Sequence, residues 1–263
     1  MFVKGGHSYR GYSVGILMFD NKRFPMPPGD VGNATTYPFP VLMRQIKGLE
    51  DNPYPPIKDE NGTYTPEVQM CIEAAQELEQ DGVRAIAMCC GFFALIQEAV
   101  AESVSIPVIT SPLIMIPVIR QLIKPDQSIA VVTAAANLLS AEFFEAVGVD
   151  REDRISLVGL DHSKAFNSIC MGATGIELET DELRDDILAG IQNARNTDPS
   201  IGAILLECTS LPPYAADVHA STALPVFDFI ACVEWLHRAV APTPYQGYIW
   251  RPNRSQTIFH TIG

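Results

Sequence analysis

Residues 203–209 read Ala-Ile-Leu-Leu-Glu-Cys-Thr, a short apolar run that ends at a cysteine, and the same pattern occurs earlier in the chain. Ala85-Ile86 precedes Cys90 by the same spacing at which Ala203-Ile204 precedes Cys208. The second cysteine follows the first by 118 residues (208 − 90). Apolar runs of this length, bounded by turn residues, are typical of buried strands. The repeat therefore predicts two similar units, each with a cysteine where a buried strand ends.

A proline-led strand follows each cysteine, and it repeats with the same offset. Ile106-Pro107-Val108 matches Leu224-Pro225-Val226, again 118 residues apart (225 − 107). Strand and helix signals alternate through the rest of the chain, which is typical of mostly parallel sheets flanked by helices. We expect an α/β fold with two pseudo-symmetric Rossmann-like lobes and the active site in the cleft between them. The first lobe is predicted to comprise 1–115 and 225–263, and the second 116–224.

Composition and charge exclude several classes of partner. The 263 residues are 47% hydrophobic and 19% charged, which indicates a globular protein rather than a disordered one. The formal net charge is −13, so we expect no nucleic acid partner and no membrane surface. The amino-terminal residues lack the apolar stretch of a signal peptide. Together with the size of the chain, this predicts that the six cysteines are reduced thiols in the cytoplasm.

Cys90 and Cys208 are the candidate catalytic residues. A thiol between a strand and the amino terminus of a helix meets unpaired amides and the positive end of the helix dipole, and both lower its pKa. A thiolate in that position acts as a nucleophile or as a general base. Two thiols on opposite sides of a cleft suit proton abstraction from a carbon next to a carboxylate. The remaining cysteines are interpreted as small buried hydrophobic residues: Cys71, Cys89, Cys170 and Cys232.

Several short motifs resemble the aspartate/glutamate racemase superfamily: Gly15-Ile16-Leu17, Cys90-Gly91-Phe92, Thr133-Ala134 and Glu207-Cys208-Thr209. The resemblance covers most of the chain. It implies two pseudo-symmetric domains, a cysteine pair that works without a cofactor, and a homo-oligomer, either a dimer or a tetramer. Amino-acid racemases of this superfamily usually follow the first cysteine with Asn-Thr, which helps to hold the substrate carboxylate. Here Gly91-Phe92-Phe93 replaces that polar clamp with aromatic surface.

Within the superfamily the sequence is most similar to Alma-type dimethylsulfoniopropionate (DMSP) lyases. The segments that carry this similarity are Pro28-Gly29-Asp30, Cys90-Gly91-Phe92 and the stretch 203–214. The resemblance implies a cofactor-independent lyase that cleaves DMSP to dimethyl sulfide and acrylate, with a cysteine removing the α-proton before β-elimination. The alternative is a racemase or isomerase of a small amino or dicarboxylic acid, of the aspartate, glutamate or hydantoin type, that uses both cysteines. A third alternative is an inactive protein that binds small acids.

The substrate is therefore expected to be a small zwitterion or carboxylate. Aromatic faces hold a sulfonium cation, and a hydroxyl with backbone amides holds a carboxylate. The candidate substrate-binding residues follow the two cysteines or lie in segments before them: Gly91, Phe92, Phe93, Thr209, Tyr214, Asp30, Tyr37 and Thr133.

The remaining acidic and histidine residues give no clear indication of a catalytic or metal-binding role. Glu207 is adjacent to Cys208 and, by the alternation of a strand, is expected to face away from it in a structural or interface role. The five histidines show no zinc-binding spacing, so we expect no metal. The sequence contains no phosphate-binding glycine motif, which argues against a nucleotide cofactor.

Overall fold

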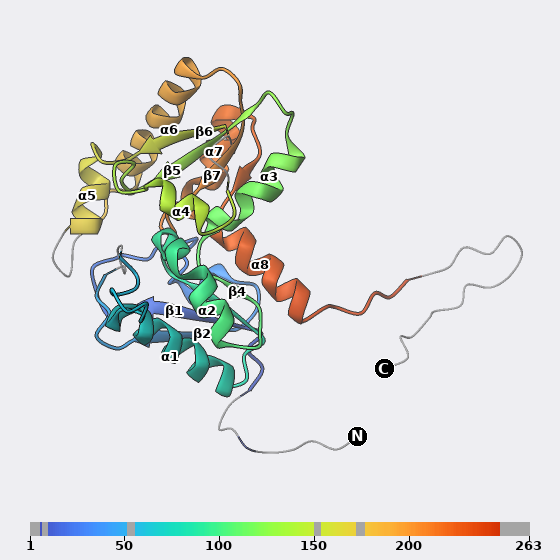
Figure 1. Ribbon diagram of the computed structural model, residues 1–263. Coiled ribbons are helices and arrows are strands. Elements are labelled where there is room, and N and C mark those ends of the chain that lie inside the picture. Colours follow the sequence, from blue (N-terminus) through green and yellow to red (C-terminus); the bar gives the residue numbers. More distant parts are fainter. Residues whose placement is uncertain (1–5, 7–9, 52–55, 150–153, 172–176, 248–263) are drawn as a thin grey trace, which may run out of the picture.

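The computed structural model describes residues 6, 10–51, 56–149, 154–171 and 177–247, without the side chains of 169–171. The interpretation of Cys170, and the predictions for 1–5, 7–9 and 248–263, lie outside the described residues. The fold consists of two lobes, one above the other in Figure 1, each built on a sheet of four parallel strands. The predicted α/β architecture is confirmed.

The first sheet has the strand order β2-β1-β3-β4 and the second has the order β6-β5-β7-β8. The first comprises β1 (Val14–Phe19), β2 (Val41–Ile46), β3 (Ala85–Met88) and β4 (Val108–Ile109). The second comprises β5 (Ser128–Thr133), β6 (Ile155–Gly159), β7 (Ile201–Leu206) and β8 (Val226–Phe227). The two orders are equivalent, with the cysteine-bearing strands β3 and β7 third in each sheet.

The register of the sheets follows the sequence repeat. Ile86 pairs with Val108 in the first sheet, and Ile204 pairs with Val226 in the second. These two pairs are related by the 118-residue offset, because 204 − 86 and 226 − 108 are equal. Every residue of β1, β3, β5 and β7 is buried, as expected for central strands covered by helices on both faces.

Helices connect the strands in both lobes (Figure 1). The α-helices are α1 (Pro66–Gln80), α2 (Gln97–Ser103), α3 (Ile116–Leu122), α4 (Ala141–Glu145), α5 (Lys164–Met171), α6 (Thr180–Thr197), α7 (Ala215–Thr222) and α8 (Phe229–Val240). Short 3₁₀ helices are η1 (Ala34–Thr36), η2 (Gly91–Ile96), η3 (Pro112–Met115) and η4 (Pro212–Tyr214). Among the described residues, no helix is both long enough and apolar enough to cross a membrane.

The chain returns to the first lobe through α8. Strand β8 pairs with β7 and so belongs to the second sheet, whereas α8 packs against β1 and β3. Asp228 caps α8 by accepting a hydrogen bond from the Ala231 amide at 2.9 Å. At the other end of the helix, the Ser13 hydroxyl lies 2.6 Å from the Nδ1 atom of His237. Asp228 therefore lies between the last strand of the second sheet and the helix that packs on the first.

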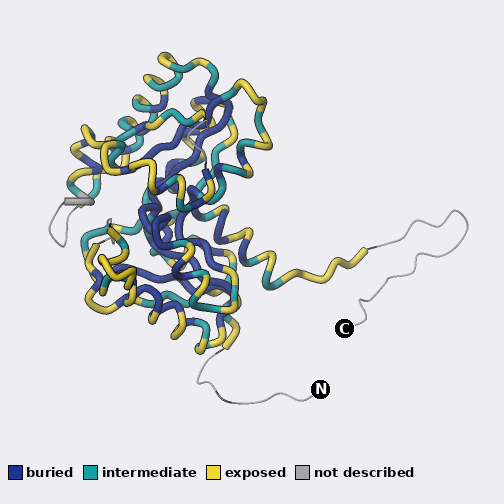
Figure 2. The backbone as a smooth tube through the Cα atoms, in the orientation of Figure 1, coloured by how far each residue is buried: buried dark blue, intermediate teal, exposed yellow. Residues whose placement is uncertain are grey.

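The two lobes share a continuous apolar core. Figure 2 shows buried backbone running from one lobe into the other. One core cluster contains the strands of the first lobe together with Val131 and Leu205 of the second sheet. At the junction the rings of Phe92 and Phe143 meet edge to face, with their centroids 5.2 Å apart. This packing holds the carboxyl ends of the cysteine-bearing strands against one another.

Candidate active site

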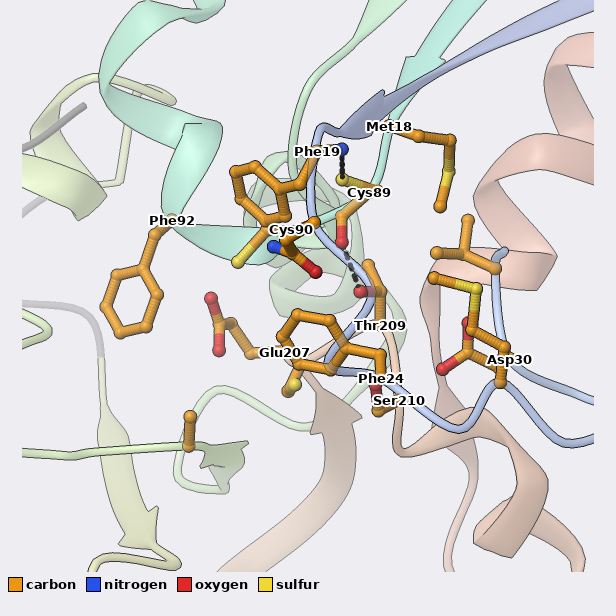
Figure 3. A pocket seen from close by; sticks show the side chains of 15 residues that line it. Met18, Phe19, Phe24, Asp30, Cys89, Cys90, Phe92, Glu207, Thr209 and Ser210 are labelled. Carbon is orange, nitrogen blue, oxygen red and sulfur yellow. Dashed lines mark hydrogen bonds between the residues drawn. The ribbon is translucent and has the colours of Figure 1, made fainter. Parts of the chain in front are cut away.

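The structure brings both predicted cysteines to one pocket between the lobes (Figure 3). Cys90 follows β3 and is the N-cap residue of η2, while Cys208 lies two residues beyond the end of β7. Because β3 and β7 occupy equivalent positions in facing sheets, their carboxyl ends meet at the junction. The described cysteines are thiols rather than disulfides.

The pocket is small and mostly apolar. Its cavity volume is about 60 Å³. One water needs about 10–15 Å³ on this measure, so the cavity holds roughly four to six water-sized groups, the size of a small metabolite. The lining residues are Met18, Phe19, Asn21, Phe24, Met26, Asp30, Val31, Cys89, Cys90, Phe92, Ala134, Glu207, Cys208, Thr209 and Ser210. This set contains two carboxyl groups and no lysine, arginine or histidine.

Thr209 joins the two lobes beside the thiols. Its hydroxyl donates a 2.6 Å hydrogen bond to the backbone carbonyl of Cys89, and its own carbonyl accepts a 3.4 Å bond from the Val31 amide. The Phe19 amide in turn donates to the Cys89 sulfur at 3.3 Å. Thr209 lines the pocket, but its hydroxyl donates its proton to a backbone carbonyl and therefore cannot donate it to a substrate carboxylate.

Glu207 lies in the pocket, contrary to the expectation that it faces away. Strand β7 ends at Leu206, so the alternation of side chains does not extend to Glu207. In Figure 3 its carboxylate points into the pocket, between Cys90 and Phe92. The side chain is buried, and neither carboxylate oxygen has a hydrogen-bond partner among the described residues.

Burial raises the pKa of Glu207 from the usual 4.5 to about 7. The Thr133 hydroxyl lies near enough to oppose part of this increase, although the two groups form no hydrogen bond of regular geometry. Gly91 provides the space for the carboxylate. A Cβ atom at position 91 would lie 1.9 Å from Oε1 of Glu207, and therefore only glycine fits there. Gly91 therefore makes room for the Glu207 side chain and does not itself line the pocket.

Asp30 lines the same pocket from the loop that follows β1. Its carboxylate accepts a 2.7 Å hydrogen bond from the Gly32 amide. Burial raises the pKa of Asp30 to about 6, and the bonds to Gly32 and Ser210 oppose the increase. The loop is anchored by Tyr37, whose hydroxyl donates to the Val31 carbonyl at 3.0 Å. Tyr37 therefore supports the pocket wall and does not line the pocket.

Three other predicted substrate-binding residues lie outside the pocket. Phe93 is fully buried in the first lobe, where its ring packs against Phe19 at 5.1 Å between centroids. The Thr133 hydroxyl is buried at the end of β5. Tyr214 is buried in the core of the second lobe, and its hydroxyl has no hydrogen-bond partner among the described residues. Of the predicted aromatic residues, only Phe92 lines the pocket.

Several pocket residues were not identified from the sequence: Met18, Phe19, Asn21, Phe24, Met26, Val31, Ala134 and Ser210. Most lie at the end of β1 or in the loop after it. A proline- and glycine-rich segment after the first strand was a signal for this region, because such loops carry binding residues. Among the described residues, the pocket included, no group of three or more histidine, cysteine, aspartate or glutamate side chains is arranged so that it could hold a metal ion.

Comparison with known proteins assigns the chain to a family. The sequence profile described as Asp/Glu/Hydantoin racemase matches residues 45–236. The chain belongs to this family. As a family member, it shares its fold with the allantoin racemase of Klebsiella pneumoniae. The TM-score is 0.57 at 17% identity, with 87% of this chain and 88% of the racemase covered.

Curated relatives of this family member are DMSP lyases. The enzyme of Durusdinium sp. clade D is 31% identical over 241 residues, which cover 89% of this chain and 77% of the relative. DMSP lyase 5 of Emiliania huxleyi (strain CCMP1516) is 29% identical over 234 residues, which cover 84% of this chain and 46% of the relative. The chain thus spans about half to three quarters of the length of these two relatives.

Proposed function

We propose that this member of the Asp/Glu/hydantoin racemase family is a lyase that cleaves DMSP to dimethyl sulfide and acrylate. The observation that carries the proposal is the lining of the pocket: three thiols, three phenylalanine rings and two carboxyl groups, without a cationic side chain among the described residues. DMSP carries one carboxylate and one sulfonium, so its net charge is zero. The similarity to the DMSP lyase of Durusdinium sp. supports the same substrate.

The charge of the pocket favours this substrate over an acidic amino acid. Aspartate and glutamate each bring two carboxylates, and a racemase must hold both beside Asp30 and Glu207. Like charges in a desolvated site repel each other strongly, because the local dielectric is low. A sulfonium is instead attracted to carboxylates and to aromatic faces, where each ring contributes about 0.5–2 kcal/mol. Phe19, Phe24 and Phe92 provide such faces.

The proposed chemistry is a β-elimination started by one thiolate of the pair Cys90 and Cys208. The thiolate removes a proton from the carbon next to the carboxylate. The electron pair of that C–H bond forms the new double bond, and the bond between carbon and sulfur breaks. Dimethyl sulfide leaves with the bonding pair, acrylate remains, and the thiol later releases its proton to solvent. No cofactor is required, because the sulfonium is already a good leaving group.

The test is the release of dimethyl sulfide from DMSP into the headspace. The variants Cys90→Ser and Cys208→Ser are each expected to lower the rate by about 10²–10⁴-fold, the usual contribution of a general base. Cys71→Ser is the matched control, because Cys71 is a buried cysteine of α1 outside the pocket.

The alternative reaction gives a different result in the same samples. A racemase incorporates deuterium from heavy water into aspartate, glutamate or a hydantoin without releasing gas. Deuterium uptake that both cysteine variants abolish, with no dimethyl sulfide above the controls, would replace the lyase proposal with the racemase one. Both reactions depend on proton abstraction beside a carboxylate, and they differ in the leaving group.

The proposal extends to the state of the protein in the cell. We propose a homo-oligomer, a dimer or tetramer, in the reducing cytoplasm. Exposed apolar side chains suited to contacts between copies include Trp235 on α8, which is 57% exposed, and Leu122 on α3, which is 66% exposed. Light scattering of the purified protein measures the oligomeric state, and a monomer at micromolar concentration would contradict this part.

A further inference from the structure

Glu207 is a buried carboxyl group of the pocket that takes no part in the proton transfer of the proposed elimination. Its side chain is buried, its two carboxylate oxygens have no hydrogen-bond partner among the described residues, and Figure 3 shows it directed between Cys90 and Phe92. A buried carboxylate without a partner is costly for the folded protein. Its retention in a ligand-sized cavity therefore points to a partner that the ligand supplies.

A cationic group is the partner that best stabilises the ionised carboxylate. Among the described residues, the pocket lining contains no lysine, arginine or histidine that could neutralise the carboxylate. The ring of Phe92 lies beside Glu207, and its face attracts cations as well. A carboxylate next to an aromatic face suits an onium group, whose charge is spread over methyl groups that donate no hydrogen bonds. A primary ammonium would instead need several hydrogen-bond acceptors.

We propose that Glu207 and Phe92 form a subsite for the onium group of the substrate, a sulfonium or a quaternary ammonium. The choice of ligand rests on the proposed function, whereas the subsite itself rests on the geometry of Glu207. The onium group occupies the space between the carboxylate and the ring. Gly91 leaves room for the carboxylate itself, because a Cβ atom there would overlap Glu207 Oε1.

The subsite makes binding depend on pH in a defined direction. A cation stabilises the ionised form of Glu207, and burial in the empty pocket favours the protonated form, with a pKa of about 7. Affinity for a cationic ligand is therefore low below this pKa and increases as the pH rises through it. The other titratable groups that line the pocket are Asp30, Cys89, Cys90 and Cys208. Among these, Asp30 has a pKa of about 6 and also requires a control.

The test compares two unreactive ligands that differ only in charge. One is β-alanine betaine, the trimethylammonium analogue of DMSP, and the other is its tert-butyl isostere, in which carbon replaces the charged nitrogen. Isothermal titration calorimetry at pH 8 measures the dissociation constant of each. The wild type is expected to bind the betaine at least about tenfold more tightly, and the variant Glu207→Gln is expected to lose this preference.

Asp30→Asn is the matched control. It also removes a buried carboxylate from the pocket, but one that already accepts a hydrogen bond from Gly32, so the variant is expected to keep most of the preference. The wild type alone provides a second measurement that does not depend on any variant folding. Between pH 6 and pH 8 its affinity for the betaine is expected to rise, while its affinity for the isostere, a net anion, does not rise.

An unchanged preference in Glu207→Gln would overturn the subsite, and so would failure of the wild type to prefer the betaine. These results are distinct from failure of the lyase proposal. If the wild type prefers the betaine but releases no dimethyl sulfide, the subsite stands and the lyase proposal fails. If dimethyl sulfide is released and the KM for DMSP in Glu207→Gln equals that of the wild type, the lyase proposal stands and the subsite fails.

Discussion

Replacement of Gly91 by alanine tests the close approach between the two lobes at the pocket. Gly91 begins η2 directly after Cys90 and is buried. The added Cβ atom would lie 1.9 Å from Oε1, 2.4 Å from Cδ and 2.5 Å from the backbone oxygen of Glu207. The carboxylate can rotate away from the new methyl group, but the backbone oxygen cannot. We therefore expect Gly91→Ala to push η2 away from the end of β7.

The size of the effect follows from two opposing contributions. Overpacking a close-packed site costs about 1–3 kcal/mol. The backbone contact places this substitution in the upper half of that range. Replacing glycine by alanine also reduces the conformational freedom of the unfolded chain, which stabilises the folded protein by about 0.4–1 kcal/mol. We expect the free energy of unfolding to decrease by about 1.5–2 kcal/mol in Gly91→Ala.

Urea denaturation measures the loss of stability, and the release of dimethyl sulfide measures the effect on the pocket. The displaced carboxylate and the shifted Cys90 are expected to lower the rate by about tenfold or more, because small displacements of reacting groups are costly. Gly247→Ala is the control, since Gly247 is exposed and a Cβ atom there meets nothing within 4 Å. If both variants unfold within about 0.5 kcal/mol of the wild type, the close approach at Gly91 does not exist.

Three further predictions concern individual side chains. Burial raises the pKa of Glu207 from 4.5 to about 7, so the protonated carboxyl stabilises the fold at low pH and this stabilisation is lost as the pH rises through 7. In urea titrations, the free energy of unfolding of Glu207→Gln should therefore equal that of the wild type near pH 4 and exceed it by up to about 3 kcal/mol at pH 8. A difference between the two proteins that does not change with pH would refute this. Thr209→Val removes the donor to the Cys89 carbonyl and is expected to cost about 1–3 kcal/mol, whereas Thr209→Ser keeps the donor and should restore most of the loss. Tyr214→Phe removes a buried hydroxyl without a partner among the described residues, so thermal melts should show equal or higher stability and the headspace assay an unchanged rate.

The repeated pattern of residues predicted the fold because a parallel strand is specified locally. Apolar runs bounded by turns mark the central strands, and the proline-led segments mark their neighbours. The pairing of Ile86 with Val108 and of Ile204 with Val226 preserves the spacing seen in the sequence. The point where the chain returns to the first lobe is harder to predict from the sequence, because β8 is only two residues long and its pairing partner is not encoded locally.

The candidate site was predicted in part. Cys90 and Cys208 were identifiable because each follows a strand whose end is visible in the sequence. Asp30, Phe92 and Thr209, which the sequence offered as substrate-binding candidates, also line the pocket. Aromatic residues were less predictable, since a ring next to a cysteine in sequence can point in any direction. Phe93 turns into the core of the first lobe, while its neighbour Phe92 lines the pocket.

By itself, the sequence determined the two similar lobes, the alternation of strands and helices, and the two cysteines at equivalent positions. These features depend on local patterns of burial and on spacing along the chain. Only the tertiary structure decided the direction of Glu207, because the side-chain alternation ends with β7 at Leu206. Its carboxylate enters the pocket through the space left by Gly91, a residue 116 positions earlier in the chain (207 − 91). A contact over that distance depends on how the lobes pack, which no local pattern specifies.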